Sequence, residues 1–263
     1  MTAPARAAVF APRPGAAPLG RMLLAQTGLE VRMMLRNGEQ LLLTIVIPVL
    51  VLTVYGSVEL MDLGSRSQRL EFLVPGVLAL AVLSTAFTGL AIGTGFERRY
   101  GALKRLGASP LSRSALLAAK GLSVLAVETL QVVLLGAVAL AMGWAPPWSP
   151  GTVLAAVVLL LAGTAAFSAL ALLMAGTLRA EATLAGANLV YLLLLVSGGI
   201  AVPLDRFPDA SRPALETLPA GALAEGLREV LADGAGLPVA HLLVLLAWAA
   251  AAGVLAARTF RWE

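Results

Sequence analysis

Long apolar runs constrain the fold of this chain more than any other feature. A helix needs about 20 predominantly apolar residues to cross the roughly 30 Å of bilayer hydrocarbon. Six segments approach or exceed that length: Leu41–Val58, Leu73–Gly95, Ala115–Met142, Thr152–Leu178, Ala182–Leu204 and Leu237–Ala257. An open strand cannot satisfy its backbone polar groups within lipid, whereas a helix can. We therefore expect an all-α membrane protein with six transmembrane helices.

The composition agrees with a membrane protein. Of the 263 residues, 59% are hydrophobic and 13% are charged, whereas soluble domains hold about 25% charged residues. The isoelectric point of about 10.1 would suit a nucleic-acid-binding protein. Membrane proteins, however, concentrate Lys and Arg in cytoplasmic loops for topological reasons, so we expect no nucleic acid as a partner. The absence of cysteine excludes disulfides, thiol catalysis and Cys-based metal sites.

The distribution of basic residues predicts the orientation. If the N-terminus is cytosolic, the 19 Lys and Arg residues lie on the cytosolic side with five exceptions, which are Arg66, Arg69, Arg206, Arg212 and Arg228. This asymmetry has the direction that the positive-inside rule demands. We therefore predict a multi-pass protein of the cytoplasmic (inner) membrane with both termini in the cytosol.

Two segments precede the first span. Residues 1–18 contain Pro12, Pro14 and Pro18, which are incompatible with a regular helix, and we expect a disordered cytosolic tail. The segment Leu19–Glu39 predicts an amphipathic helix, because Arg21, Arg32 and Arg36 fall within about 60° of one another at 100° per residue. Such a helix lies in the membrane interface against lipid, or it packs on the loop 97–113 as an ordinary cytosolic helix.

The loop 97–113, ERRYGALKRLGASPLSR, joins the second and third predicted spans. Ser109 and Pro110 are typical of an N-cap and a first helical position, so they predict a helix start that runs into the third span. Leu103 and Leu106 are three residues apart beside Lys104 and Arg105, a pattern that could dock on a partner. The alternative is a solvated turn whose charges only fix the topology.

Two stretches resemble ABC-2 type exporter permeases. The segment ERRYGALKRLGASPLSRSALLAAKG resembles the cytoplasmic loop of that family, with an acid–basic start, a Gly-x-Leu core and a Ser-Pro-Leu-Ser-Arg step before a helix. Ala119 replaces the Gly that many relatives have before the equivalent of Lys120. The segment Ser197–Leu231 resembles the end of the fifth span and the external hairpin, although Leu218 replaces the usual Asn before Pro219.

The resemblance implies one transmembrane domain, residues 19–263, that works with other chains. In that family the cytoplasmic loop docks on a separate ATP-binding cassette ATPase, which holds ATP and Mg, and two permease subunits pair, here as a homodimer. A helix equivalent to residues 19–39 packs beside the loop. The implied ATPase-coupling residues are Glu97, Arg98, Arg99, Gly101, Leu103, Lys104, Arg105 and Leu106.

The chain itself carries no recognisable catalytic motif. A P-loop requires G-x-x-x-x-G-K-[ST], but Lys104 lies in Leu-Lys-Arg and Lys120 precedes Gly121. We therefore expect no enzyme activity and no cofactor in this chain. We expect no metal site either, and we interpret the single histidine, His241, as an interfacial residue. Lys120 is close enough to the inner surface to extend its ammonium toward the headgroups.

Several polar residues fall inside the predicted spans. By resemblance, spans two and five line the translocation path, which makes Thr85, Thr88, Asn188 and Tyr191 path candidates; hydrogen bonding between helices explains each equally well. Asn188 and Tyr191 are one turn apart and are expected to share a face. Glu128 either faces a neighbouring helix or a hydrated crevice, or it lines the path or carries a proton.

These observations leave three functions open. The first is an exporter permease that moves an amphipathic drug-like molecule or a lipid, powered by a separate ATPase. The second is an ion-gradient-driven carrier that uses Glu128. The third is a non-transporting membrane assembly subunit.

Two further elements are expected. Gly89 and Gly93 form a GxxxG pattern suited to close helix packing. In the external loop 205–236, an amphipathic helix is expected to lie on the outer membrane surface. Its apolar stripe is Leu223, Leu227, Val230 and Leu231, with Glu225, Arg228 and Glu229 opposite.

Overall fold

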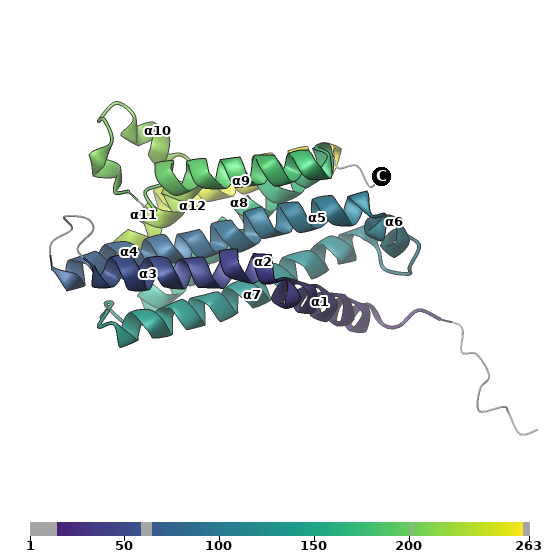
Figure 1. Cartoon of the computed structure of the whole chain (residues 1–263), viewed down its shortest axis with the longest axis horizontal. Helices are drawn as coiled ribbons and strands as arrows, with labels where there is room; N and C mark the ends of the chain where they lie inside the picture. The colour runs from purple at the N-terminus through teal and green to yellow at the C-terminus, as the bar shows by residue number, and fades with distance from the viewer. Residues whose placement is uncertain (1–14, 59–64, 201, 260–263) are drawn as a thin grey trace, which may run out of the picture.

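The computed structural model describes residues 15–58, 65–200 and 202–259. Those residues form helices and connections without a strand, which confirms the all-α prediction. Most helices lie side by side along the long axis of the molecule, and the chain reverses direction at its two ends (Figure 1). The greater part of the predicted tail, residues 1–14, lies outside the described residues.

The described residues form the following helical elements in chain order. Their bounds are α1 Leu19–Arg36, α2 Gly38–Leu41, the π-helical segment η1 Leu42–Val46, α3 Ile47–Ser57, α4 Arg66–Val82, the π-helical segment η2 Leu83–Gly89, α5 Leu90–Arg99, α6 Ala102–Gly107, α7 Arg113–Ala141, α8 Pro150–Thr177, α9 Ala180–Ser197, the 3₁₀ turn η3 Leu204–Arg206, α10 Arg212–Glu216, α11 Pro219–Leu231 and α12 Val239–Thr259.

Among the described residues, 5 helices are long and apolar enough to cross a membrane. They are Arg66–Arg99, Ser114–Ala141, Pro150–Thr177, Ala180–Ser197 and Val239–Thr259, which match the second to sixth predicted spans. The first predicted span, Leu41–Val58, is also helical through η1 and α3, but its apolar part, Thr44–Ser57, is shorter. The chain is therefore a multi-pass membrane protein, while a crossing by the first helix stays a prediction.

The continuous helix formed by α4, η2 and α5 is the core of the bundle. Its most apolar window is 89% buried, and every residue from Leu73 to Thr88 is buried. Phe87 packs on Phe167 of α8 with ring centroids 6.4 Å apart. Ser65 begins the helix with a capping box that includes Gln68, which satisfies two backbone N–H groups at its start.

The surrounding helices present apolar side chains outward. Only 28% of the apolar window of α9 and 17% of that of α12 are buried, and Leu189, Leu192 and Leu193 of α9 are all more than half exposed. A soluble monomer rarely exposes so large an apolar surface. Hydrocarbon is the solvent that fits these helices.

Two predicted helix ends are wrong. The segment Ala182–Leu204 ends as helix at Ser197, because Gly199 takes a left-handed conformation with φ 67°, which glycine adopts without steric strain. The helix predicted to start at Ser109 is α7, and it begins at Arg113. Its N-cap is Ser112, whose hydroxyl accepts from the Ala115 N–H at 3.2 Å. The Ser109 hydroxyl donates to the Leu106 carbonyl at 2.6 Å and closes the turn after α6.

The external helix α11 does not lie on a membrane surface, so that prediction is wrong. Its expected stripe is buried, but so are Ala220, Ala222, Ala224 and Arg228. The helix packs between α4, α8 and α12. Its glycines and alanines have too little volume to keep these neighbours apart, so α11 inserts into the end of the bundle.

Candidate functional site

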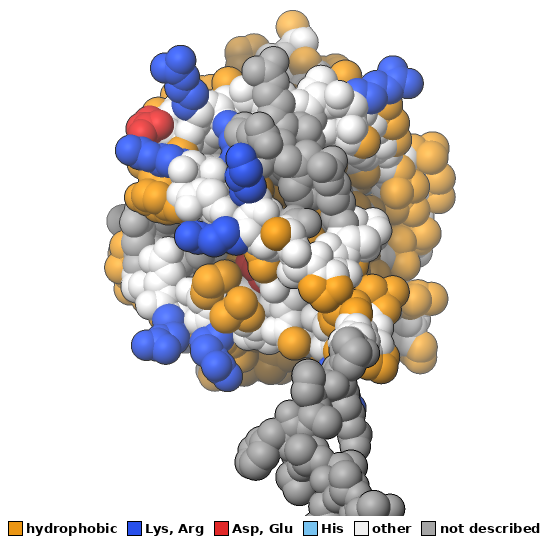
Figure 2. Space-filling model, turned by 90° about the vertical axis from the view of Figure 1, so that its right-hand side faces the viewer, with side chains coloured by type: hydrophobic (Ala, Val, Ile, Leu, Met, Phe, Trp, Pro, Cys, Tyr) orange, Lys and Arg blue, Asp and Glu red, His pale blue; other side chains and the backbone are white. Residues whose placement is uncertain are grey.

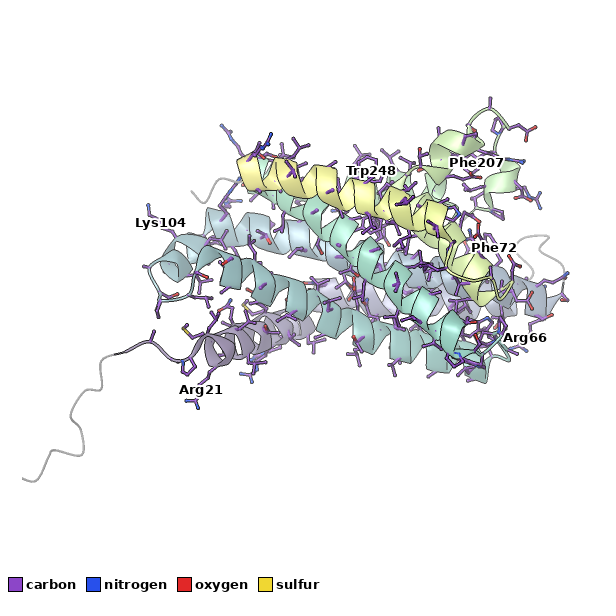
Figure 3. The ribbon with its side chains drawn as sticks, turned by 180° about the vertical axis from the view of Figure 1, so that it is seen from behind. Arg21, Arg66, Phe72, Lys104, Phe207 and Trp248 are labelled. Atoms are coloured by element: carbon purple, nitrogen blue, oxygen red, sulfur yellow. The ribbon has the colours of Figure 1, made fainter. Side chains whose placement is uncertain are left out.

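The two ends of the bundle differ in charge. α1, α6 and the last turn of α12 lie at one end, and α10 and the residues flanking the α3–α4 connection lie at the other (Figure 1). Lys and Arg side chains gather on the α6 end (Figure 2). Figure 3 shows Arg21 and Lys104 at that end and Arg66, Phe72 and Phe207 at the opposite end. The ends therefore separate the basic residues as the charge count predicts.

The loop 97–113 folds around the short helix α6. The backbone turns after α5 at Gly101, which has φ 68°. Leu103 is 1% exposed, whereas Lys104 and Arg105 are exposed. Leu103 therefore fixes α6 to the bundle, and the prediction that its side chain meets a partner does not fit this burial. A coupling role for the loop stays a prediction.

The root of the loop is bound to α8 and α9. Nη1 of Arg98 donates to the Gly176 carbonyl at 2.8 Å, and Nη2 donates to the Leu178 carbonyl. A cation at a helix C-terminus satisfies carbonyls that lack intrahelical partners and interacts favourably with the helix dipole. Arg99 forms an ion pair with Glu181 in the first turn of α9. Both arginines thus hold the end of α5 against its neighbours.

A buried ionic cluster joins three helices at the same level. The ammonium of Lys120 on α7 lies 2.6 Å from Glu97 Oε2 on α5, and 3.1 and 3.2 Å from the two carboxylate oxygens of Glu30 on α1. Gln26 Nε2 donates to Glu30 Oε1 at 2.9 Å. Lys120 is 3% exposed, so it points into the protein and not toward the headgroups. We call Gln26, Glu30, Glu97 and Lys120 the Lys120 cluster.

The arginines of α1 lie away from this cluster. Arg21, Arg32 and Arg36 are exposed, as are Leu24, Leu29 and Met33, while Gln26 and Glu30 are buried. Sequence reasoning missed Gln26 and Glu30. Their signal was present, because two polar residues four apart share one helix face and this face lies opposite the basic stripe.

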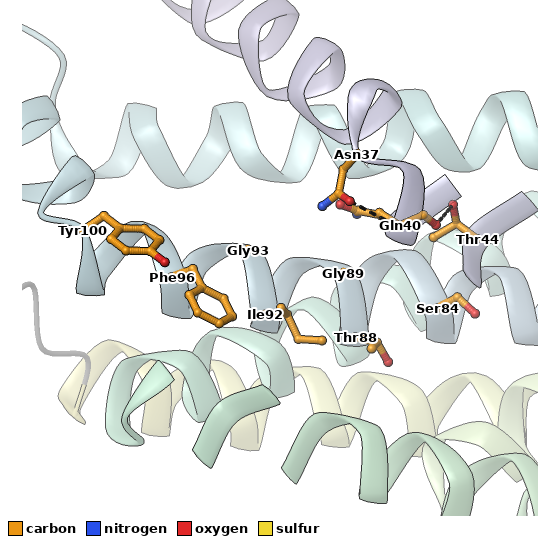
Figure 4. A pocket seen from close by; sticks show the side chains of 10 residues that line it. All are labelled: Asn37, Gln40, Thr44, Ser84, Thr88, Gly89, Ile92, Gly93, Phe96 and Tyr100. Carbon is orange, nitrogen blue, oxygen red and sulfur yellow. Dashed lines mark hydrogen bonds between the residues drawn. The ribbon is translucent and has the colours of Figure 1, made fainter. Parts of the chain in front are cut away.

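A cavity of about 290 Å³ opens beside the core helix. Figure 4 shows Asn37, Gln40 and Thr44 from the α1–α2 connection and the start of the first apolar helix, facing Ser84, Thr88, Ile92, Phe96 and Tyr100 along η2 and α5. A second cavity of about 260 Å³ shares Asn37, Gln40 and Phe96 with it and extends to Glu97 and Lys120. The lining is thus polar toward η1 and aromatic toward the α6 end.

Both π-helical segments contribute to a hydrogen-bonded network behind this cavity. The Thr85 hydroxyl of η2 donates to Gln131 Oε1 at 2.9 Å, and Gln131 Nε2 donates to the Thr44 carbonyl of η1. Polar side chains can satisfy backbone groups that a local change of helical pitch leaves unpaired. Short π-helical segments occur frequently at functional sites.

The predicted path residues are only partly brought together. Thr88 lines the cavity, and Thr85 is buried next to it in the network. Tyr191 is buried at 8% exposure, whereas Asn188, three residues before it on the continuous helix α9, is exposed, so of the two only Tyr191 faces the interior of the bundle. Glu128 lies between α7 and α8 at a separate niche.

The GxxxG pattern has two different roles. A Cβ on Gly89 would lie 2.5 Å from Gln40 Nε2, so Gly89 leaves room for the end of that side chain. A Cβ on Gly93 would meet nothing within 4 Å, and this residue borders the cavity. Neither glycine meets the backbone of another helix, so close helix packing at this pattern stays a prediction.

The opposite end is organised around Arg228 of α11. Its guanidinium lies 4.0 Å from the Phe72 ring centroid, pairs with Glu225 and donates to the Gly199 carbonyl. These contacts satisfy a side chain that is 9% exposed. Nearby, His241 Nε2 lies 3.1 Å from Glu229 Oε1.

A comparison with known protein families assigns this chain to one of them. The family model described as ABC-2 type transporter matches residues 23–232, which extend from α1 to the residue after α11. Among curated proteins, no match to the chain was found. The matched family consists of membrane transport components, generally non-enzymatic, that generally work with a separate ABC ATPase. The chain therefore belongs to the ABC-2 type transporter family.

Proposed function

We propose that this chain is the permease subunit of an ATP-driven exporter in the cytoplasmic membrane. Six helices cross the bilayer, both termini lie in the cytosol, and the chain forms a homodimer. Two ATP-binding cassette subunits dock at the α6 end and supply ATP and Mg. The cargo is an amphipathic drug-like molecule or a lipid.

The observation that carries this proposal is the attachment of the α6 loop to the bundle. Leu103 anchors α6, Arg98 ties its root to the end of α8, and the Lys120 cluster ties the same root to α1 and α7. A loop bound on all these sides cannot move independently of the helices. A displacement imposed on Lys104 and Arg105 by a docked ATPase is therefore transmitted to the spans.

The cavity beside η2 supports an amphipathic cargo. Small-molecule sites combine apolar and aromatic walls with a few oriented polar groups. Asn37, Gln40 and Thr88 supply polar groups on one part of the cavity, and Ile92 and Phe96 supply apolar surface on another. One molecule with a polar and an apolar part matches both.

The exposed face of α1 supports contact with lipid. It presents Arg21, Arg32 and Arg36 between the exposed apolar side chains Leu24 on one side and Leu29 and Met33 on the other. A basic stripe flanked by apolar residues suits the boundary between anionic headgroups and acyl chains. In this arrangement α1 lies in the cytosolic interface and packs on α7 from its other face.

Co-purification with a P-loop ATPase encoded in an adjacent reading frame tests the proposal. Lys104→Glu combined with Arg105→Glu reverses the exposed charges of α6. The double variant is expected to reduce ATPase recovery about tenfold or more, because the ATPase groups that attract Lys104 and Arg105 would repel two glutamates. The matched control is Arg179→Glu with Arg258→Glu, which changes the net charge equally at exposed positions outside α6, before α9 and in the last turn of α12. Equal ATPase recovery with both double variants would show that α6 is not the docking element.

Reconstituted vesicles separate the remaining functions. The exporter requires the ATPase subunit and ATP for movement of a fluorescent amphiphile. Movement by the chain alone under an ion gradient would favour the carrier that uses Glu128. ATPase binding without movement of any tested amphiphile would favour the assembly subunit.

A further inference from the structure

A niche between α7 and α8 is not used by the proposed coupling mechanism. Its volume is about 190 Å³, and its walls are aliphatic side chains that include Leu125, Val132, Val157 and Leu161. Val157 and Leu161 are 44% and 48% exposed, so the rim opens on the outside of the bundle, where apolar side chains face hydrocarbon. One carboxyl group, that of Glu128, lies in this apolar niche.

The Glu128 carboxyl has one satisfied and one unsatisfied oxygen. The Thr164 hydroxyl donates to Oε2 at 2.6 Å. Oε1 is buried without a hydrogen-bond partner among the described residues, and the whole residue is 6% exposed. An unsatisfied buried acceptor costs about 1–3 kcal/mol, and more when it is charged. A carboxylate within hydrocarbon therefore needs a donor, a proton or a cation near this oxygen.

We propose that this niche binds the ammonium head of an alkylammonium amphiphile that enters from the bilayer. The ammonium supplies both the positive charge and the hydrogen-bond donor that Oε1 lacks. A cavity of about 150 Å³ is large enough for benzene, so 190 Å³ accommodates the head and the first methylene groups. The remaining tail lies along the aliphatic rim and continues into lipid.

The chemistry of the walls distinguishes this ligand from others. An alkyl carboxylate or phosphate head would place like charges together beside Glu128. An alkyl alcohol offers a donor but leaves the charge of the carboxylate uncompensated. The inference concerns binding alone and holds whether or not the bound molecule is transported, so its failure leaves the proposed function untouched.

Photolabelling tests the proposal with a dodecylamine that carries a diazirine in its tail. The chain is reconstituted without an ATPase in phosphatidylcholine vesicles, and labelled residues are identified by mass spectrometry. The wild type is expected to show saturable labelling on α7 and α8. Glu128→Gln keeps the size of the side chain and an acceptor for Thr164 but removes the charge, and it should raise the half-saturating concentration about tenfold or more, since hydrogen bonds to charged groups contribute about 1.5–3 kcal/mol.

Three comparisons complete the experiment. Glu229→Gln removes a carboxylate on α11, outside the niche, and should label as the wild type does. Leu161→Trp fills the niche without altering the carboxyl and should abolish saturable labelling. The matched diazirine dodecanol should respond to Leu161→Trp but not to Glu128→Gln.

Two results would overturn the proposal. One is labelling that rises linearly with concentration and is equal in all variants, which indicates partitioning into the bilayer only. The other is a half-saturating concentration for dodecylamine that Glu128→Gln leaves unchanged, which indicates an apolar niche without ionic recognition. Each variant is first shown to elute and unfold as the wild type does. If Glu128→Gln does not fold, a wild type that binds the dodecylamine no more tightly than the matched dodecanol would overturn the proposal.

Discussion

Single polar residues determine how the apolar helices of this protein are held together. In the Lys120 cluster one ammonium lies between the carboxylates of Glu30 and Glu97, and both Lys120 and Glu30 are almost completely buried. The attraction between such groups is offset by the loss of their hydration. Removal of the cation alone therefore leaves two like charges close together in a poorly hydrated site.

Replacement of Lys120 by methionine should destabilise the protein strongly. Breaking a buried ion pair by removing one partner costs about 3–5 kcal/mol, so Lys120→Met is expected to lower the unfolding temperature in lipid nanodiscs clearly. Adding Glu30→Gln to this variant should restore part of the loss, because one carboxylate is then neutral. Lys104→Met on the exposed face of α6 is the control. Unfolding of Lys120→Met at the wild-type temperature would show that the cluster contributes nothing.

The sequence predicted the individual members of such sites better than their partners. Lys120 and Glu128 were recognisable because each interrupts an apolar run. Lys120 and Glu30, however, are 90 positions apart, and no local pattern connects α1 with α7. The partner of Glu128 could not be predicted either. Thr164 is a small polar residue in the long apolar helix α8, and it donates to Glu128 only because α7 lies beside α8.

At the scale of elements, α11 shows how small residues place a helix inside the bundle. A Cβ on Gly221 would collide with the backbone carbonyl of Leu215, and a Cβ on Gly226 would lie 3.1 Å from the Cβ of His241. These glycines therefore permit backbone approach that any larger residue would prevent. The insertion of α11 seats Arg228 against Phe72.

Gly221→Ala should destabilise the protein by about 1–3 kcal/mol, the usual effect of overpacking. The colliding atom belongs to the backbone of α10, which cannot rotate away as a side chain can. Gly236→Ala is the matched control, because a Cβ there meets nothing within 4 Å and the change slightly restricts the unfolded chain. Thermal unfolding of the two variants in the same nanodiscs makes the comparison. Equal unfolding temperatures would contradict the close packing of α11.

The helices whose position is determined by apolar content were predicted well. The helix ends and the π-helical segments, which depend on local geometry, were predicted less well. The second to sixth spans follow from their hydropathy alone. The start of α7 was misplaced because Ser109 and Ser112 are both good N-caps. The Ser109 hydroxyl bonds back to the Leu106 carbonyl and closes the turn after α6, and Ser112 caps α7. The segments η1 and η2 have no distinctive composition, and each contributes one group to the Thr85–Gln131–Thr44 network.

At the scale of the whole molecule, charge divides the bundle into two ends. Lys and Arg gather over α6 and the neighbouring termini of the spans (Figure 2). The proposed exporter needs this end in the cytosol, because ATP and the ATPase are there. The opposite end, with α10 and Asp209, then lies outside.

Labelling of single cysteines in intact cells tests this orientation most directly. The natural chain has no cysteine, so Ser109→Cys beside α6 and Asp209→Cys at the opposite end each provide one reactive group without background. Both positions are exposed. With a membrane-impermeant maleimide we predict that Asp209→Cys is labelled in intact cells and that Ser109→Cys is labelled only after permeabilisation. Labelling of Ser109→Cys from outside, with Asp209→Cys protected, would contradict the account, because a docked cytosolic ATPase could not then reach α6.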